Sequence, residues 1–133
     1  MNDIEIVERA ALSDDALNDL FALTWPAHVR RDFARVLQHS LTYFAAFEAQ
    51  QLVGFVNLAW DGGSHAFVLD PTVHPRSQRQ GLGSLLVRRA LVAASEGGVE
   101  WVHVDYAPHL ASFYAALGFR ITTAGVLRVR VAQ

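Results

Sequence analysis

The stretch HPRSQRQGLGSLL, residues 74–86, concentrates residue types that bind anions. Arg76 and Arg79 supply positive charge, and Gly81 and Gly83 stand just before an apolar run with helical spacing. Glycine lets a backbone turn tightly, and the first amides of a helix lack partners and carry about half a positive charge. The stretch therefore predicts a phosphate-sized anion site. The alternative is an ordinary strand-to-helix turn, which explains one of the two glycines.

Three better-known motifs are excluded at this position. A dinucleotide-binding fingerprint requires a third glycine where this chain has Leu86. A Walker loop requires a lysine, and all 11 basic residues of the chain are arginines. A nucleophile elbow requires the order Gly-x-Ser-x-Gly, whereas Ser84 follows Gly83 directly. Positive charge at this site must therefore come from guanidinium groups, backbone N–H groups or histidine.

Composition narrows the class of protein. The 133 residues fit one domain, predicted to span 1–133, and 52% of them are hydrophobic, which is enough for a core. The chain has no cysteine, no membrane-spanning apolar run and no signal peptide at its acidic N-terminus. Its net charge of −2 lacks the basic excess typical of nucleic-acid-binding proteins. We therefore expect a cytoplasmic protein that binds neither nucleic acid nor membranes.

Hydrophobic periodicity and turn residues predict strands and helices around the anion site. Strands are expected at residues 4–8, 42–48, 51–60, 65–73, 99–106, 119–123 and 126–131. Helices are expected at residues 12–25, 27–40, 81–95 and 108–118. Pro71 predicts a bulge in the strand 65–73, because proline has no N–H for the ladder. The alternation of strand and helix in the second half predicts at least one parallel pair with a crossover.

Two stretches of the chain resemble motifs of one known family. Residues 74–86, with Val73 before them, are similar to motif A of the GCN5-related N-acetyltransferase (GNAT) family, which reads Gln/Arg-x-x-Gly-x-Gly/Ala after a strand ending in Val-x-Pro. The stretch HLASFYAALGF, residues 109–119, resembles the motif B helix of this family. The matching residues are Gln78, Gly81, Gly83, Phe113, Tyr114, Gly118 and Phe119. The order of predicted elements is also similar along nearly the whole chain.

The resemblance implies an α/β fold with a mixed, mostly antiparallel twisted sheet of about seven strands. A central splayed parallel pair, strands 65–73 and 99–105, would hold acetyl-CoA where its strands part, and about four helices would flank the sheet. Acetyl-CoA is implied as acyl donor, without a metal. The amides of residues 79–84 would hold its pyrophosphate, and the backbone of Thr72 and Val73 would pair with the pantetheine. The implied cofactor-binding residues are Thr72, Val73, Gln78, Arg79, Gln80, Gly81, Leu82, Gly83 and Ser84.

The resemblance also implies direct transfer of an acetyl group to a primary amine of a small molecule or peptide. The N–H of Val73 would stabilise the charge on the carbonyl oxygen. Tyr114 matches the family tyrosine that protonates the leaving thiolate, and a phenol with a pKa of about 10 keeps its proton at neutral pH. A packed ring with a solvated hydroxyl is the structural alternative for Tyr114. The second hypothesis for the chain is a non-catalytic acyl-CoA-binding sensor or partner domain.

The group that removes the proton of the amine is where the chain departs from the family pattern. Members often carry Glu or His where this chain has Phe67 and Leu69. Asp70 and Asp105 are the candidate catalytic carboxylates instead, and a water-mediated base is a further alternative. Asp70 faces the opposite side of its strand unless the bulge at Pro71 turns it.

The remaining polar and aromatic side chains have competing interpretations. His65 and His103 lie near the candidate carboxylates, but histidines at strand edges are common and no acidic cluster accompanies them, so no metal is assigned. The final predicted strand, VLRVRV, alternates apolar residues with arginine and indicates an exposed edge or a homodimer seam. The aromatic residues that would line an acceptor site, or only pack, are Trp25, Trp60 and Tyr106.

Overall fold

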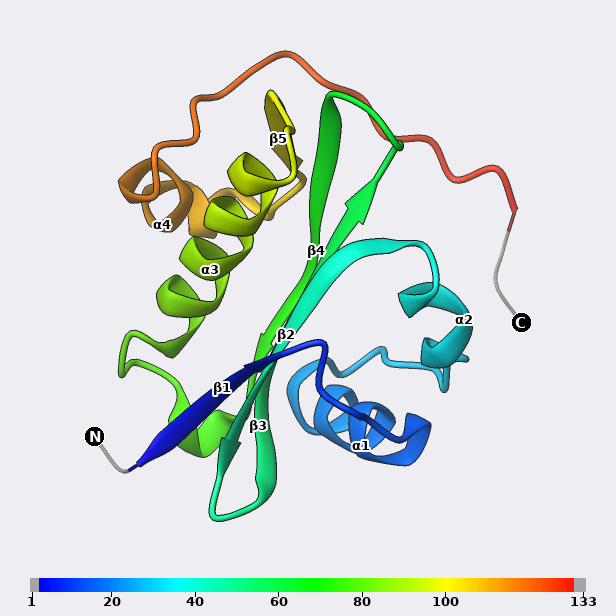
Figure 1. Cartoon of the computed structure of the whole chain (residues 1–133), viewed down its shortest axis with the longest axis vertical. Coiled ribbons are helices and arrows are strands. Elements are labelled where there is room, and N and C mark those ends of the chain that lie inside the picture. Colours follow the sequence, from blue (N-terminus) through cyan, green and yellow to red (C-terminus); the bar gives the residue numbers. More distant parts are fainter. Residues whose placement is uncertain (1–2, 131–133) are drawn as a thin grey trace.

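Five strands form one twisted sheet in the computed structural model, which describes residues 3–130 (Figure 1). Neighbouring strands are antiparallel except the last two, which are parallel and connected through a helix. The predicted hairpin at residues 42–60 and the predicted parallel pair are therefore confirmed. In spatial order the strands are β1 (Ile4–Glu8), β2 (Ser40–Glu48), β3 (Gln51–Trp60), β4 (His65–Val73) and β5 (Trp101–Val104).

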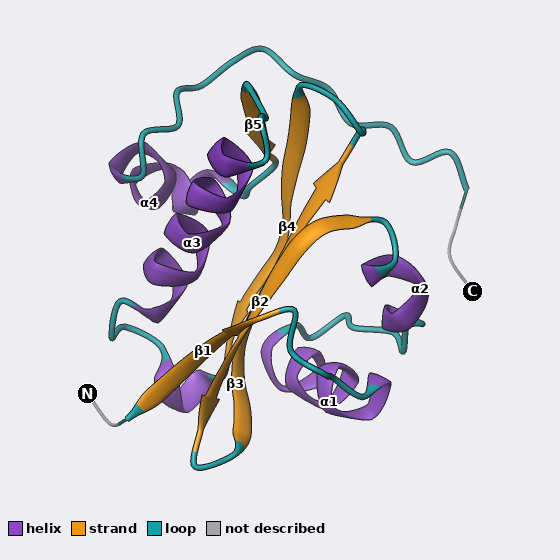
Figure 2. Ribbon diagram, viewed as in Figure 1, coloured by secondary structure: helices purple, strands orange, loops and turns teal. Residues whose placement is uncertain are grey.

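Helices cover both faces of this sheet (Figure 2). The first two helices lie on one face and the last two on the other, and one-turn 3₁₀ helices at Pro75–Ser77 and Pro108–Leu110 precede the latter two. In the described residues, no helix has both the length and the apolar character that crossing a membrane requires. The helices are α1 (Asp14–Thr24), α2 (Phe33–Leu37), α3 (Leu82–Glu96) and α4 (Ala111–Ala116).

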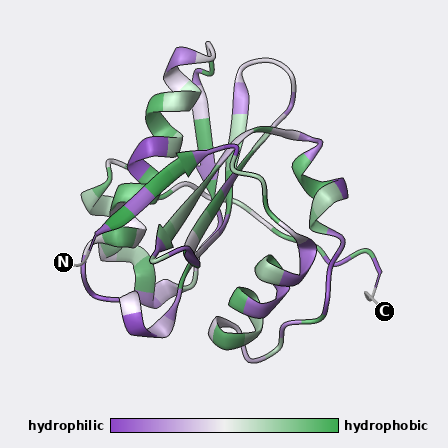
Figure 3. Ribbon diagram, turned by 60° about the horizontal axis from the view of Figure 1, so that its bottom comes forward, coloured by the Kyte–Doolittle hydropathy of each residue, from purple (hydrophilic) through white to green (hydrophobic). Residues whose placement is uncertain are grey.

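Apolar side chains hold both helical layers on the sheet. On the α1–α2 side, the ring of Phe21 lies 4.9 Å from that of Phe33 and 6.0 Å from that of Phe55, measured between centroids. Figure 3 shows apolar colouring along the strands and alternating colouring along the helices, as two buried interfaces require. Complete burial of one large apolar side chain contributes about 1.5–3 kcal/mol. On the other side, α3 buries Leu82, Leu86, Val87, Ala90 and Ala94.

Close packing between α3 and β3 fixes the start of α3. A Cβ atom on Gly54 of β3 would lie 3.0 Å from Leu86 Cδ1 and 3.3 Å from Leu82 Cδ2. Protein interiors are too densely packed to absorb such short contacts without movement, so glycine lets the helix approach the sheet. Leu82 is the first residue of α3. Gly54 therefore helps to place the helix end that follows the predicted anion-binding stretch.

β4 changes its partners along its length. Over its first four residues it pairs with β5 as well as with β3, because the parallel ladder joins residues 65–68 to residues 101–104. Beyond Val68 it continues to Val73, paired with β3 alone among the described strands. The two parallel strands therefore part at this point, as the predicted splay requires.

The predicted bulge at Pro71 is confirmed. Asp70 and Pro71 of β4 together lie opposite one residue of β3, Val56. Asp70 has a φ of 54°, in the left-handed region that occurs at bulges. This conformation turns the side chain of Asp70 toward the α1–α2 segment, where its Oδ2 lies 3.2 Å from Nη1 of Arg31.

The prediction of seven strands is wrong for the described residues, which contain five. Residues 119–123 and 126–130 have no strand partner, and residue 131, the end of the last predicted strand, lies outside the described part of the chain. An alternating pattern indicates which side chains share a face, but a strand also needs a neighbouring edge for its hydrogen bonds. The prediction of a central parallel pair is wrong as well, because β5 is the edge strand of the described sheet.

The second predicted helix, 27–40, is shorter in the structure. Residues 27–32 are not helical, and α2 begins at Phe33 with Asp32 as its N-cap. The buried side chain of Asn18 explains the difference, because its Oδ1 accepts from Arg31 N at 2.9 Å and its Nδ2 donates to Arg31 O at 3.0 Å. These bonds take up the backbone groups that a longer helix would use. The segment between α1 and α2 is thereby fixed to α1.

Candidate functional site

The backbone of the stretch between β4 and α3 adopts a conformation that is unfavourable for most residue types. Arg79 has a φ of 64° and Gly81 a φ of 82°, both in the left-handed region. Gln78 Nε2 donates to Val73 O at 3.0 Å, which ties the stretch back to the end of β4. The unusual turn is therefore held by a side chain that belongs to the motif itself.

The N-terminus of α3 has no side-chain cap. Gly81 occupies the N-cap position, and the first turn carries no acidic residue. Leu85 N donates to Gly81 O at 3.0 Å, so the amides of residues 82–84 have no helical acceptor. These amides coincide with the positive end of the helix dipole. An oxyanion such as a phosphate would complete their hydrogen bonds.

The two glycines leave room for a ligand to approach these amides. A Cβ atom on Gly81 would have no neighbour within 4 Å, and one on Gly83 would lie 3.6 Å from Val73 and 3.8 Å from Phe113. Packing within the chain therefore does not require glycine at position 83. Leu82 buries its side chain in the core and can offer a ligand only its backbone. The remaining predicted pyrophosphate residues, Gln80 and Ser84, are exposed and partly exposed.

One of the two arginines in the stretch is engaged elsewhere. Arg76 Nη2 lies 3.3 Å from Glu48 Oε1, at the end of β2. Arg79 is exposed and, within residues 3–130, forms no ion pair. An anion at the start of α3 would therefore meet the guanidinium of Arg79 and a set of backbone donors.

The open edge of β4 presents the backbone of Val73. His74 N donates to Val53 O of β3 at 2.8 Å. Successive residues of a strand direct their backbone groups to alternate sides, so Val73 directs its N–H away from β3, to the side from which β5 has parted. Thr72 directs its backbone toward β3, and its buried hydroxyl accepts from Trp25 Nε1 at 3.0 Å.

Side chains of the segment between α1 and α2 contact the bulge of β4. Trp25 reaches it through the hydrogen bond just described, and Arg31 reaches it through its ion pair with Asp70. The guanidinium of Arg31 also lies over the rings of Phe21 and Phe33, 5.1 and 4.9 Å from their centroids. Asp70 therefore lies on the α1–α2 face of the sheet with its carboxylate held by a fixed cation.

His28 joins the same segment to α1. Its Nε2 lies 2.9 Å from Asn18 Oδ1, which also accepts from Arg31 N, so His28 Nε2 donates this hydrogen bond. Burial lowers the pKa of His28, the nearby guanidinium of Arg31 lowers it further, and Asp70 opposes the shift. The segment therefore accommodates the neutral imidazole.

Tyr114 lies on α4 and is buried, with 3% of its surface exposed. Tyr106 stacks on its ring at 4.7 Å, and Phe113 and Phe119 meet it edge-on at 4.9 and 5.7 Å. Burial raises the pKa of Tyr114, so its phenol is protonated at neutral pH. Trp60, another aromatic candidate for the acceptor site, is the last residue of β3, and its Nε1 donates to Gly63 O at 2.9 Å.

Asp105 lies where β4 and β5 part. It follows β5 directly, one residue past the last pair of the parallel ladder, Val68 with Val104. It is exposed, and strand alternation places it on the same face as His103. Asp105 is therefore exposed to solvent close to the point where the two strands part.

His65 and His103 form a pair that sequence reasoning treated as separate surface histidines. Nδ1 of His65 lies 2.8 Å from Nε2 of His103, so one imidazole donates a hydrogen bond to the other, and Phe67 stacks on His103 at 4.9 Å. The register of β4 against β5 brings them together, and no local pattern indicates that register. Within residues 3–130, no three His, Asp or Glu side chains are grouped closely enough to hold a metal ion.

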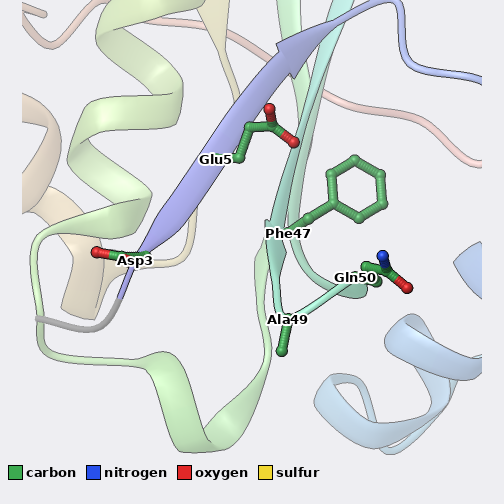
Figure 4. A pocket seen from close by; sticks show the side chains of 5 residues that line it. All are labelled: Asp3, Glu5, Phe47, Ala49 and Gln50. Carbon is green, nitrogen blue, oxygen red and sulfur yellow. The ribbon is translucent and has the colours of Figure 1, made fainter.

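A surface pocket lies at the other edge of the sheet, near the turn between β2 and β3 (Figure 4). None of the predicted site residues lines this pocket, so it lies apart from the predicted site. Its lining residues are Asp3, Glu5, Phe47, Ala49 and Gln50.

Comparison with known proteins assigns the chain to a family. Residues 11–119 match the family model described as "Acetyltransferase (GNAT) family". The chain therefore belongs to the GNAT acetyltransferase family, as its two motifs predicted. The structure is similar to that of "Acetyltransferase, GNAT family protein SP0256" from Streptococcus pneumoniae TIGR4, with a TM-score of 0.81, 27% identity and coverage of 96% of this chain and 98% of that one.

Curated relatives match over part of their length. A mycothiol acetyltransferase of Mycolicibacterium vanbaalenii is 31% identical over 78% of this chain and 35% of its own length. An uncharacterized N-acetyltransferase, ycf52, of Porphyra purpurea is 28% identical over 68% of this chain and 56% of its own length. The chain thus spans about a third to just over half of these relatives. An aminoglycoside N-acetyltransferase, AAC(6')-Iy, solved in complex with CoA, shares the fold with a TM-score of 0.77, 18% identity and coverage of 99% of this chain and 97% of that one.

The lowered pKa of His28 predicts a pH dependence of stability. Because the folded state lowers this pKa below its ordinary value of 6.5, the unfolded chain binds the proton more readily. The free energy of unfolding should therefore be highest above about pH 6.5 and decrease as the pH falls below that value. His28→Gln should flatten this decline, measured by chemical denaturation between about pH 5 and 8.

His39, an exposed residue that follows α2, provides the control for this measurement. His39→Gln should leave the decline in place, and His74, whose pKa is also lowered by burial, should leave a residual slope in the His28→Gln variant. An unchanged slope in His28→Gln would show that the imidazole does not contribute.

Proposed function

We propose that this chain, acting as a single domain, transfers an acetyl group from acetyl-CoA directly to a primary amine of a small molecule or peptide. The observation that carries the proposal is the uncapped start of α3, whose free amides stand beside a parallel pair that parts. Family membership and a neighbour of the same fold solved with CoA support acetyl-CoA as the donor.

The cofactor-binding residues divide into two groups in this proposal. The first group holds the pyrophosphate, chiefly through backbone amides and the guanidinium of Arg79. The second group serves the acyl end of the pantetheine: Val73 directs its free backbone N–H to it, Gln78 holds the carbonyl of Val73, and Thr72 fixes the bulge through its hydroxyl. The residues of the first group are Arg79, Gln80, Gly81, Leu82, Gly83 and Ser84.

The chain supplies a hydrogen-bond or proton donor for each negative charge that the transfer creates. Acetyl-CoA brings an activated thioester; as the new N–C bond forms and the C–S bond breaks, the amine loses a proton and the sulfur gains one. The N–H of Val73 at the open edge donates to the carbonyl oxygen while charge develops there. Tyr114, whose raised pKa keeps it protonated, donates its proton to the leaving sulfur.

The proton of the amine goes to Asp105 in this proposal. Asp105 is exposed at the mouth where β4 and β5 part, so an acceptor amine can reach it. Asp70 is the poorer acceptor, because Arg31 holds its carboxylate at 3.2 Å and an amine would have to displace that cation. Asp70 therefore acts as a positioning residue for the α1–α2 segment.

Gly81 and Gly98 provide a matched test of the anion site. Both have a φ of 82° and no atom within 4 Å of a built Cβ, but they lie at opposite ends of α3. Gly81→Val and Gly98→Val should each lower the free energy of unfolding by about 1–2 kcal/mol. Only Gly81→Val should weaken CoA binding, by at least about tenfold, measured by isothermal titration calorimetry.

Gly83→Val separates ligand contact from backbone strain, because Gly83 does not have a positive φ. We expect weakened CoA binding with little change in stability. If Gly81→Val, Gly83→Val and the unsubstituted chain bound CoA with equal affinity, the start of α3 would not be part of the CoA-binding site.

The transfer is tested by release of free thiol from acetyl-CoA in the presence of a panel of primary amines. The chain should turn over, and Tyr114→Phe should lower kcat on the order of a hundredfold while CoA affinity stays close to normal. Tyr106→Phe, which alters the ring stacked on Tyr114, is the matched control and should retain most of the rate.

Two outcomes would contradict this account. Tight CoA binding without turnover of any amine would favour the non-catalytic acyl-CoA-binding domain. An unchanged kcat in Tyr114→Phe would leave Tyr114 with a packing role only.

The assignment of Asp105 is tested by the value of kcat/KM at neutral pH. Asp105→Asn should lower kcat/KM by about a hundredfold at neutral pH, because general-base catalysis contributes about 10²–10⁴-fold. Asp70→Asn should act mainly on KM, through the position of Arg31. If Asp105→Asn were fully active and His103→Gln slow, the imidazole pair would replace Asp105 as the proton acceptor.

A further inference from the structure

Large apolar side chains are exposed on one face of the sheet where β4 and β5 pair. Ala66 and Val68 of β4 pack into the core on the α3 side, so Phe67 and Leu69 point to the opposite face. Phe67 is 38% exposed and Leu69 is 41% exposed. In Figure 1, β5 lies at the end of the sheet opposite to α1. Neighbouring apolar side chains that stay exposed in this way indicate a binding surface.

Aromatic side chains of β5 extend the same face. The valines of β5 pack against the core, so Trp101 and His103 point away from it, and Trp101 is 49% exposed. The register pairs Phe67 with His103, and their rings stack at 4.9 Å between centroids with 19° between their planes. His65 stacks on the same imidazole at 5.0 Å with an angle of 29°. The surface, called the aromatic patch below, consists of His65, Phe67, Leu69, Trp101 and His103.

Asp105 adjoins the aromatic patch. It comes one residue after the last pair of the parallel ladder, as Leu69 does on β4, so the two lie on either side of the point where the strands part. Strand alternation gives both side chains the face of the patch. The stacked pair of Phe67 and His103 lies two residues back, which is about 7 Å along the strands. The proposed proton acceptor therefore has an apolar neighbour beside it and stacked rings a short distance away.

The charges around the aromatic patch favour a cation over an anion. The two segments that carry the patch, residues 60–73 and 99–109, contain four carboxylates and neither arginine nor lysine. One of the four is Asp70, which is paired with Arg31. The other three, Asp105 among them, form no ion pair within the described residues. A protonated amine is therefore attracted to this end of the sheet, and an acceptor that carries a carboxylate is disfavoured.

The patch and the carboxylate together define what an acceptor for this surface carries. A cationic nitrogen meets Asp105, and a flat apolar group packs against rings that already stack. A chain of two or three carbons spans the interval between them. We propose, on the basis of the acetyl transfer proposed above, that the acceptor is a primary amine with an aromatic ring two or three carbons from its nitrogen, and that this ring packs on Phe67, Leu69 and His103.

The same arrangement favours release of the product. Transfer converts the amine to an amide and acetyl-CoA to free CoA, and the proton of the amine goes to Asp105. The amide carries no charge, so it is no longer attracted by the carboxylates around the patch. The ring alone then holds the product on an exposed surface.

The acceptor class is tested by thiol release from acetyl-CoA with a short series of primary amines. The value of kcat/KM for 2-phenylethylamine should exceed that for propylamine by at least about tenfold, because the ring adds apolar contacts that propylamine cannot make. Benzylamine, whose chain has a single carbon, should be a poorer substrate than 2-phenylethylamine. Phenylalanine, which adds a carboxylate beside the amine, should be poorer by about tenfold or more.

Substitutions of Phe67 test the aromatic patch itself. Phe67→Ala removes a stacked ring at an exposed position, so it should bring the ratio of kcat/KM for 2-phenylethylamine to that for propylamine close to one. Phe67→Trp keeps an aromatic ring and should retain the preference. Val92→Ala, at a position on α3 that is 56% exposed, is the matched control and should leave the ratio unchanged. CoA affinity, measured by isothermal titration calorimetry, should be the same in all three variants.

Binding of the ring is measured without transfer, in the complex of the chain with CoA, by proton NMR of the imidazoles. 2-Phenylethylamine should shift the signals of His65 and His103, because an aromatic ring placed beside them alters their local magnetic field. Propylamine at the same concentration should shift them much less. His65→Gln and His103→Gln identify the two sets of signals.

The outcomes separate this acceptor from the transfer itself. Equal values of kcat/KM for propylamine and 2-phenylethylamine, a preference that persists in Phe67→Ala, or imidazole signals that do not respond to 2-phenylethylamine would overturn the aromatic acceptor and leave acetyl transfer in place. No turnover of any amine would overturn the transfer, and the aromatic acceptor with it.

Discussion

The arrangement of the site depends on how β4 divides its backbone hydrogen bonds. Over its first four residues it is bonded on both sides, and beyond Val68 its second side is open. Pro71 lies in the open half, where its missing N–H interrupts no ladder to β5. The bulge at Pro71 shifts the register against β3, and Val73 then faces the open side just before the chain turns into α3. One short run of backbone therefore supplies both the edge donor and the helix-end donors.

An open edge of this kind is stable because side chains bond the groups around it. Gln78 bonds the carbonyl of Val73, and the hydroxyl of Thr72 accepts from Trp25 while it donates to Asp70 O at 2.9 Å. In the described residues, no buried side-chain nitrogen or oxygen lacks a hydrogen-bond partner. An unsatisfied buried polar group costs about 1–3 kcal/mol, so these bonds decide whether the bulge can persist. The α1–α2 segment is thus part of the structure that maintains the open edge.

Local pattern predicted most of the fold and the glycine turn before α3, because periodicity and glycine spacing act over a few residues. It missed features that depend on distant partners. Asn18 shortens the second helix by binding the backbone of Arg31, 13 residues away. His65 and His103 meet only through the register of two parallel strands, 38 residues apart in the chain. The tail at residues 126–130 has the alternation of a strand, but alternation does not specify the edge that a strand will join.

The donor half and the acceptor half of the proposed site differ in how firmly the structure fixes them, because each half contains a different type of chemical group. The donor half consists of backbone amides, whose position is set by α3 against Gly54 and by the turn at Gly81. Arg76 pairs with Glu48, so Arg79 is the arginine of the stretch that remains beside these amides. The acceptor half consists of side chains at the rim, such as Trp25 and Asp105, which are exposed. We therefore expect substitutions at that rim to change acceptor preference while the amides that we propose to bind acetyl-CoA stay in place, because the two sets of residues belong to different elements.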